Sequence, residues 1–221
     1  MKVIITGATG MVGKGVLLEC IDHPAIKQVL SIGRTPLGMA HPKLKELIHP
    51  NFLDFSAVKE QLKGYDACYL CMGVSAGGMK ENTYHVLTYV YTLTLAKLLL
   101  EQNPGMICAY VSGQGTDSTE NGRVMWARVK GETENALLNL GFNQAYMFRP
   151  GVIIPLRGIK SKTKNYQFVY NHFMWLIRLI KAIAPNVIVN TTQIGKSMIK
   201  ISMQDYDHKI IHSKDILLLA E

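Results

Sequence analysis

The stretch KVIITGATGMVGKGV, residues 2–16, decides the fold of this 221-residue chain. Its first part, Lys2 to Thr6, is a short apolar and β-branched run, which predicts a buried strand. Met11 to Ile21 then has helical periodicity, so a glycine-rich segment joins a strand to a helix. Such a turn presents free backbone N–H groups at the positive end of the helix, a combination that binds phosphate. The stretch therefore predicts a dinucleotide-binding loop.

Each glycine of this loop has its own predicted role. Gly7 permits the tight turn, Gly10 lets the backbone approach a pyrophosphate, and Gly13 lets the helix pack closely on the sheet. We expect the side chains between them to contact the cofactor as well: Thr9, Met11 and Val12.

Strand and helix patterns alternate along the following 130 or so residues. Strands are predicted at 28–32, 46–49, 66–72, 106–112 and 142–149, and helices at 56–62, 81–101 and 123–140. The strands are apolar runs without alternation, which is typical of parallel strands buried on both faces. The pattern predicts an α/β fold with a doubly wound parallel sheet of Rossmann type.

The pattern changes after Pro150. Helices are predicted at 166–184, 191–203 and 213–219, with a strand at 208–212. No linker separates this part, so we expect 1–221 to be a single domain in which 151–221 form a small C-terminal cap on the substrate side.

The composition, 48% hydrophobic and 18% charged, argues against disorder and predicts a folded chain. The net charge of +8 comes from scattered lysines and arginines, with a mild cluster at 157–164 that we interpret as a solvated loop. No nucleic-acid recognition motif accompanies the charge, so nucleic acid is not an expected partner.

The cysteines are interpreted as small core residues. Cys68 and Cys71 have the C-x-x-C spacing, but on a strand residues three apart point to opposite faces, so no metal site is predicted. The unpaired thiols of the chain and the lack of an apolar leader predict a cytoplasmic location.

Arg34 directly follows the second predicted strand. An acidic residue there would bind the ribose hydroxyls of NAD, whereas a cation suits the 2′-phosphate of NADP. No Asp or Glu lies between Asp22 and Glu46. We therefore favour NADP over NAD as the cofactor.

Six segments, in order, resemble the short-chain dehydrogenase/reductase superfamily in its extended and atypical branches. They are TGATGMVG at 6–13, NFLDF at 51–55, CMG at 71–73, YVS at 110–112, KGETE at 130–134 and RPG at 149–151. The resemblance, nearest to proteins labelled NAD-dependent epimerase/dehydratase-like, implies an NAD(P)-binding Rossmann fold. It also implies further cofactor contacts from Asp54, Phe55, Cys71, Met72, Gly73, Pro150 and Val152.

The resemblance implies that Ser112 is the substrate-side hydroxyl and that Lys130 holds the nicotinamide ribose. In the family a tyrosine four residues before this lysine moves the proton, because that spacing puts both side chains on one helix face. Here the position is Trp126, whose indole cannot serve as a proton shuttle near neutral pH. The resemblance therefore predicts a dehydrogenase-like site that lacks the usual catalytic tyrosine.

Two functions stay open at this point. The first is an NADP-dependent oxidoreductase or epimerase-like enzyme with another proton donor and an unknown small-molecule substrate. The second is a catalytically inactive NADP(H)-binding regulatory or scaffold protein. We interpret the apolar helix 166–184 as a core-facing helix whose basic residues extend outward to solvent. A homo-oligomer or a protein partner that covers its apolar face is the next alternative, and contact with a membrane surface is not favoured.

Overall fold

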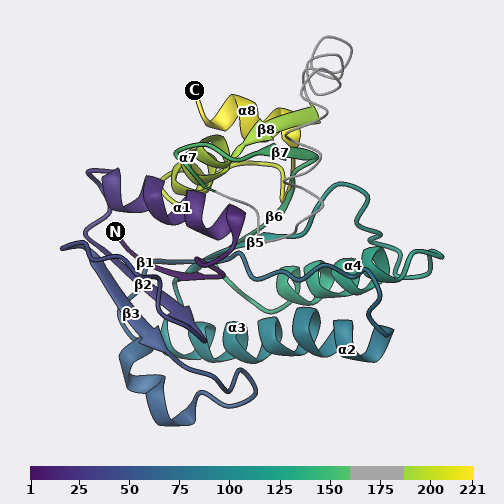
Figure 1. The fold of residues 1–221 in the computed structure, drawn as a ribbon, viewed down its shortest axis with the longest axis horizontal. Helices are drawn as coiled ribbons and strands as arrows, with labels where there is room; N and C mark the ends of the chain where they lie inside the picture. Colours follow the sequence, from purple (N-terminus) through teal and green to yellow (C-terminus); the bar gives the residue numbers. More distant parts are fainter. Residues whose placement is uncertain (160–186) are drawn as a thin grey trace.

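The computed structural model describes residues 1–159 and 187–221, and its centre is a parallel sheet with helices on both faces (Figure 1). The strands are β1 (Lys2–Thr6), β2 (Gln28–Gly33), β3 (Leu44–Ile48), β4 (Ala67–Leu70), β5 (Ile107–Val111), β6 (Gln144–Arg149) and β9 (Ile210–His212). They pair in the order β3-β2-β1-β4-β5-β6-β9, all parallel. The predicted doubly wound sheet is confirmed. Successive strands are added toward one edge from β1 to β3 and toward the other edge from β4 onward, so the strand order switches between β1 and β4, where ligands bind in such folds.

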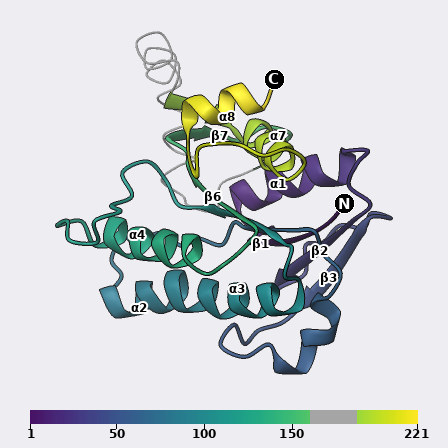
Figure 2. The same cartoon turned by 180° about the vertical axis from the view of Figure 1, so that it is seen from behind.

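Helices cover the sheet in two layers. One layer comprises α1 (Met11–Asp22), α7 (Thr191–Ile201) and α8 (Ser213–Leu219), and the other comprises α2 (Glu81–His85), α3 (Tyr91–Gln102) and α4 (Met125–Leu138). The view from behind shows the same separation, with α7 and α8 beside α1 (Figure 2). Each layer encloses its own buried apolar cluster against the sheet. Both faces of the inner strands are therefore buried, which explains their unbroken apolar runs.

The predicted helix 81–101 is one helical run with an internal irregularity. A π-helical turn, η2 (Val86–Val90), joins α2 to α3. The other predicted elements of residues 1–150 form within a few residues of their expected bounds. The short helix η1 (Ser56–Leu62) covers the residues predicted for it, while β3 begins two residues before the predicted strand.

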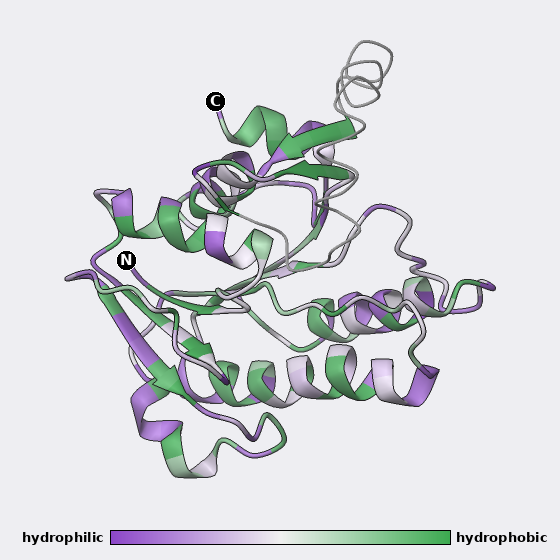
Figure 3. Cartoon of the chain, in the orientation of Figure 1, coloured by the Kyte–Doolittle hydropathy of each residue, from purple (hydrophilic) through white to green (hydrophobic). Residues whose placement is uncertain are grey.

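Two short strands were not predicted. They are β7 (Val152–Ile154) and β8 (Ile188–Asn190), which pair in parallel as a separate two-stranded sheet. Figure 3 shows hydrophobic colour on both, whereas the edge strand β3 carries hydrophilic residues. Three-residue strands are too short to produce a periodic signal. The predicted helix 166–184 and most of the basic cluster 157–164 lie outside the described residues.

The C-terminal elements pack closely on the N-terminal half through two glycines. A Cβ added to Gly15 of α1 would lie 2.4 Å from the Thr191 Cβ, and one added to Gly195 of α7 would lie 2.6 Å from the Glu19 Cγ. The backbones of helices α1 and α7 therefore pack in close contact at these two glycines. Arg157 adds an ion pair to Glu19, at 3.0 Å.

All four cysteines are free and buried. Cys68 belongs to the apolar cluster on one side of the sheet and Cys71 to the cluster on the other, as the strand spacing predicts. Within residues 1–159 and 187–221 no helix is long and apolar enough to cross a membrane.

Candidate functional site

The loop between β1 and α1 depends on its glycines for different reasons. Gly7 has a φ of +70°, and a Cβ there would lie 2.4 Å from the Cys71 carbonyl oxygen. A Cβ at Gly13 would lie 2.3 Å from the Gly7 carbonyl oxygen. Both positions therefore need glycine for the fold itself. At Gly10 an added Cβ would meet only the Gly7 carbonyl oxygen, at 3.2 Å, so the outer side of this glycine is open.

A first cavity of about 270 Å³ extends from the glycine loop over the carboxyl ends of β1 and β2. Arg34 lies at its far end, directly after β2. Apolar and aromatic side chains line it as well, among them Phe52 and Tyr91, whose rings stack with centroids 5.8 Å apart. An apolar slot beside a cation suits a planar aromatic base that carries an anionic group.

A second cavity of about 690 Å³ adjoins the first. The two share Gly10 and the segment 71–74 that follows β4. The second cavity then reaches Ser112 at the end of β5 and Lys130 on α4. The two cavities form one path across the carboxyl edge of the sheet.

The two cavities bring together most of the residues singled out from the sequence. These are Gly7, Thr9, Gly10, Met11, Val12, Arg34, Cys71, Met72, Gly73, Ser112, Lys130, Pro150 and Val152.

Asp54 and Phe55 are not brought to either cavity. The Asp54 carboxylate accepts the backbone N–H of Ser56 at 2.8 Å, and this hydrogen bond lowers the pKa of Asp54. Phe55 is buried with its ring edge-on to Phe52, and it is Phe52 that lines the cavity. In this segment it is therefore Phe52 that lines the cavity, in place of the expected Asp54 and Phe55.

Glu46 is a charged residue of the first cavity that the sequence did not indicate. The pairing of β2 with β3 sets Glu46 opposite Ser31 and at the Arg34 end of the first cavity. Its carboxylate accepts the backbone N–H of Leu37 at 2.8 Å. Glu46 is separated from β2 along the chain, so the sequence does not indicate that the two meet. The pairing of the strands brings the carboxylate to the site.

A buried ionic network lies behind Ser112. The Ser112 hydroxyl lies within hydrogen-bond distance of the Glu134 carboxylate and 3.0 Å from the Phe148 carbonyl oxygen. Glu134 has no exposed surface, and its carboxylate is paired with the Arg149 guanidinium, whose Nε lies 3.0 Å and 3.1 Å from the two oxygens. Arg149 also bonds the hydroxyl of Ser118. The network holds the Ser112 side chain in one orientation beside the cavity.

Lys130 reaches the same cavity from α4. Its ammonium donates to the Ser112 carbonyl oxygen, with the Val111 carbonyl oxygen 3.4 Å away. Desolvation lowers the pKa of Lys130 to about 8, and the negative charge of Glu134 opposes part of that shift. The lysine is therefore a cation at pH 7 that loses its proton more readily than an ordinary lysine.

Trp126 lies four residues before Lys130 and does not line either cavity. Its ring lies against the loop after β5, 3.4 Å from the position that a Cβ on Gly115 would take. Two nearby tyrosines are unsuited to replace a catalytic tyrosine, because burial raises the pKa of both Tyr84 and Tyr110. His85 bonds the Glu132 carboxylate, at 3.1 Å, outside the cavities.

Comparison with known proteins relates the chain to nicotinamide-dependent families. The model of the family described as "NAD dependent epimerase/dehydratase family" matches residues 3–126. Protein FMP52, mitochondrial, of Candida albicans is 26% identical over 235 residues, covering 100% of this chain and 98% of that protein. Protein HTATIP2 of Rattus norvegicus is 26% identical over 159 residues, covering 69% of this chain and 63% of that protein.

Solved structures share the fold. An oxidoreductase of the short-chain dehydrogenase/reductase family from Burkholderia thailandensis superimposes with a TM-score of 0.70 at 13% identity, covering 98% of this chain and 92% of that one. UDP-glucuronic acid 4-epimerase from Bacillus cereus, solved with NAD, gives 0.67 at 13% identity, covering 96% and 78%. The resemblance inferred from six sequence segments is confirmed at the level of fold and superfamily.

The expected cytoplasmic location is wrong. Several relatives, from Candida albicans, Eremothecium gossypii and Emericella nidulans, carry the word mitochondrial in their names. Free cysteines do not discriminate between compartments, since a reducing environment is not confined to the cytoplasm.

Proposed function

This chain belongs to the NAD dependent epimerase/dehydratase family, and we propose that it binds NADP(H) and acts as an oxidoreductase- or epimerase-like protein on a small-molecule substrate. One observation carries the proposal: a continuous path of two cavities leads from Arg34, past the open side of Gly10, to Lys130 and Ser112. Its lining, with a cation beside an apolar slot at one end and a cation beside a hydroxyl at the other, suits a dinucleotide lying across the carboxyl edge of the sheet.

The choice of NADP over NAD rests on Arg34. The side chain is exposed, and within residues 1–159 and 187–221 it makes no ion pair that would occupy it. Glu46 lies at the same end of the cavity and is the group that would favour NAD. One oxygen of its carboxylate accepts the Leu37 N–H, whereas the Arg34 guanidinium has no counter-ion among the described residues and would pair with a 2′-phosphate.

The reactive end of the path contains a cation and a hydroxyl. A bound nicotinamide would supply or accept a hydride there. Lys130 would hold the ribose hydroxyls through its ammonium, and Ser112 would orient the substrate oxygen, with Glu134 and Arg149 keeping its hydroxyl in place. The departure from the family pattern is Trp126, which leaves the proton transfer to another group.

Trp126 also supports a second candidate function, a protein that binds NADP(H) without turnover and acts as a regulator or scaffold. The two candidates differ in one measurement. Turnover of NADPH with any of a panel of aldehydes, quinones and keto-sugars, abolished by Lys130→Ala, would exclude the second. Tight NADPH binding with no turnover across the panel would exclude the first.

The Gly10→Ala variant tests the cofactor site directly. We expect the added methyl to occupy the space where the pyrophosphate approaches the backbone and to weaken NADPH binding at least about tenfold, or about 1.4 kcal/mol, by calorimetry. Thermal stability should change little, because the methyl meets only one protein atom, at 3.2 Å. Gly105→Ala, a glycine with open space around it, is the matched control. Normal NADPH binding by the Gly10→Ala protein would mean that the loop is only a turn.

The pKa of Lys130 predicts a pH dependence of cofactor binding. Hydrogen bonds to the ribose stabilise the ammonium form, so its pKa should rise above about 8 in the complex. Binding then takes up a proton above pH 8, and the dissociation constant should increase by up to about tenfold per pH unit there. Calorimetry from pH 7 to 9 measures this. Lys130→Arg, protonated throughout, should bind with little pH dependence, and equal profiles for the two proteins would contradict the assignment.

A further inference from the structure

The chain continues the pairing of β5 with β6 beyond the end of β5. The Ser112 N–H donates to the Phe148 carbonyl oxygen and the Gln114 N–H to the Pro150 carbonyl oxygen, each at 2.9 Å. Donors and acceptors both advance by two residues, as they do along a parallel ladder. In such a chain alternate side chains point to the same face, with Cα atoms about 6.5 Å apart. The Ser112 and Gln114 side chains therefore share one face, and both residues line the second cavity.

The Gln114 side chain is exposed, and its amide has no hydrogen-bond partner among the residues that the structure describes. A Cβ on Gly151 would lie 2.5 Å from the Gln114 amide oxygen, so the absence of a side chain at Gly151 leaves the room in which the amide lies. A glutamine amide offers two N–H donors and a carbonyl acceptor. The cavity therefore holds an unused hydrogen-bonding group beside Ser112.

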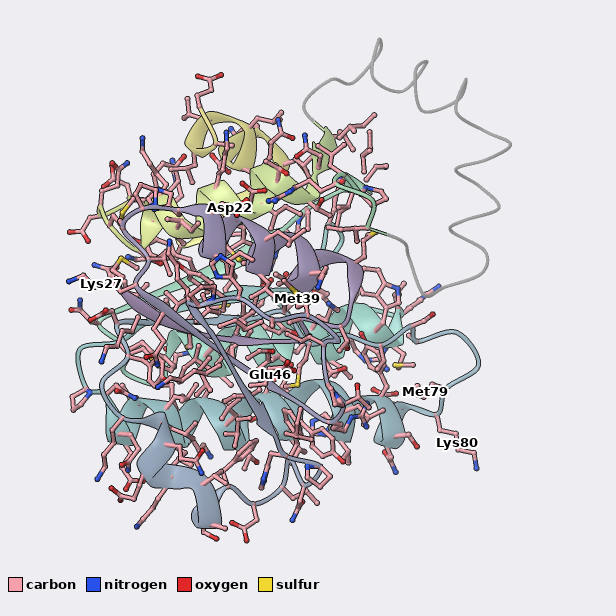
Figure 4. The ribbon with its side chains drawn as sticks, turned by 60° about the vertical axis from the view of Figure 1, so that its left-hand side comes forward. Asp22, Lys27, Met39, Glu46, Met79 and Lys80 are labelled. Carbon is pink, nitrogen blue, oxygen red and sulfur yellow. The ribbon has the colours of Figure 1, made fainter. Side chains whose placement is uncertain are left out.

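The surroundings of Gln114 in this cavity are largely uncharged. Ser75 and Ile153 line it as well. Among the described lining residues Lys130 alone is charged, and its ammonium is already bonded to main-chain carbonyl oxygens at the end of β5. Lys80, on the segment that follows Ser75, is exposed and extends outward from the molecule (Figure 4). A charged group placed beside Gln114 would lose water without gaining a counter-ion there, which disfavours a charged ligand.

We propose that Gln114 binds a second oxygen of an uncharged ketone or aldehyde whose reacting oxygen lies at Ser112. This inference rests on the proposed function and names its substrate class, a neutral carbonyl compound with an apolar body and a second hydrogen-bonding oxygen. The Ser112 hydroxyl and the Gln114 amide hold such a molecule at two points. Two points of attachment orient the carbonyl carbon toward a bound nicotinamide, whereas one leaves the molecule free to rotate.

The experiment compares three ketones by calorimetry at pH 7, on the full chain saturated with NADP+. They are 2-tetralone, 6-hydroxy-2-tetralone and the 2-tetralone that carries a carboxylate at the same ring position. All three share the apolar body and the carbonyl and differ in the second oxygen and its charge. NADP+ has no hydride to give, so the ketones bind without reacting, and the result does not depend on turnover.

We expect the hydroxy ketone to bind about fivefold more tightly than 2-tetralone, the gain from one hydrogen bond between uncharged groups. The carboxylate should bind less tightly than the hydroxy ketone. In Gln114→Met, which keeps the length of the side chain and removes the amide, the hydroxy ketone should bind within about twofold of 2-tetralone. Binding of 2-tetralone itself should stay within about twofold of the wild-type value, because it makes no contact with the amide.

Ser75→Ala is the matched control, because Ser75 is another uncharged polar residue of the same cavity. This variant should keep the fivefold preference. An equal loss of preference in Ser75→Ala and Gln114→Met would show that the effect is not specific to the amide and would overturn the inference. If Gln114→Met fails to fold, Gln114→Leu gives the same comparison.

Failure of the inference and failure of the proposed function give different results. A protein that binds no NADP+ contradicts the proposed function, and the inference fails with it. The inference alone fails if the NADP+ complex binds none of the ketones or binds the carboxylate most tightly. It also fails if the wild-type protein does not prefer the hydroxy ketone, or if the preference persists in Gln114→Met.

Discussion

Replacing Glu134 with alanine is expected to lower the free energy of unfolding by about 3 to 5 kcal/mol. The carboxylate has no exposed surface and is paired with Arg149, which is itself 12% exposed. Removing it leaves a guanidinium in a poorly hydrated place with no counter-charge, and it also removes an acceptor of the Ser112 hydroxyl. Urea unfolding at neutral pH, analysed as a two-state transition, measures the loss.

The same helix provides the control. Glu132 pairs with His85 at 3.1 Å, but both side chains are about one-third exposed, so Glu132→Ala should cost less than about 1 kcal/mol. Glu134→Gln keeps the shape of the side chain and an acceptor oxygen. Its loss of unfolding free energy should therefore lie between those of Glu132→Ala and Glu134→Ala. Equal losses for Glu132→Ala and Glu134→Ala would show that the buried ion pair does not stabilise the fold beyond a surface pair.

Restoring a tyrosine at position 126 is expected to increase carbonyl reduction with NADPH about 100-fold, at the lower end of the contribution of a well-placed proton donor. Residue 126 lies one helical turn before Lys130, on the same face of α4. The Lys130 ammonium would stabilise the tyrosinate and so adapt the hydroxyl to proton transfer. The indole lies against the loop at Gly115, and a smaller phenol ring leaves room for this contact to adjust.

Trp126→Phe separates the hydroxyl from the change in ring size. It should keep the turnover of the wild-type protein, whereas Trp126→Tyr exceeds it across the panel of aldehydes, quinones and keto-sugars. Equal rates in the two variants would mean that residue 126 does not face the reacting atoms. A wild-type rate already equal to that of Trp126→Tyr would mean that another group donates the proton.

The Lys130 and Trp126 predictions test two parts of one site, the contact with the cofactor and the donation of a proton. The pH dependence of binding tests whether Lys130 contacts the cofactor. The tyrosine variant tests whether the site needs only a proton donor to become an efficient reductase. Binding that depends on Lys130, together with a large gain from Trp126→Tyr, would describe a cofactor site that is complete and a catalytic site that is not.

Local sequence determined the elements whose apolar pattern extends over their whole length, and the turn that joins the first strand to the first helix. The glycine loop is the best example, because a strand, a tight turn and the beginning of a helix all fall within 13 residues. The spacing of Gly7, Gly10 and Gly13 by itself indicates the role of each glycine. The bounds of β1 and η1 agree with those predicted, since apolar runs and periodicity extend over the whole of these elements. The resemblance placed Ser112 and Lys130, and both line the second cavity.

Tertiary structure alone decided which distant residues share a site. Strand pairing brought Glu46 to the Arg34 end of the cavity, and the packing of α4 beneath β6 joined Glu134 to Arg149. The return of segment 34–40 to α1 brought Met39 to Lys14. Periodicity reports which face of an element is buried, and it carries no information on which element will cover that face. The order of strands in the sheet supplies that information. It thereby determines which side chains meet in the site beyond the glycine loop.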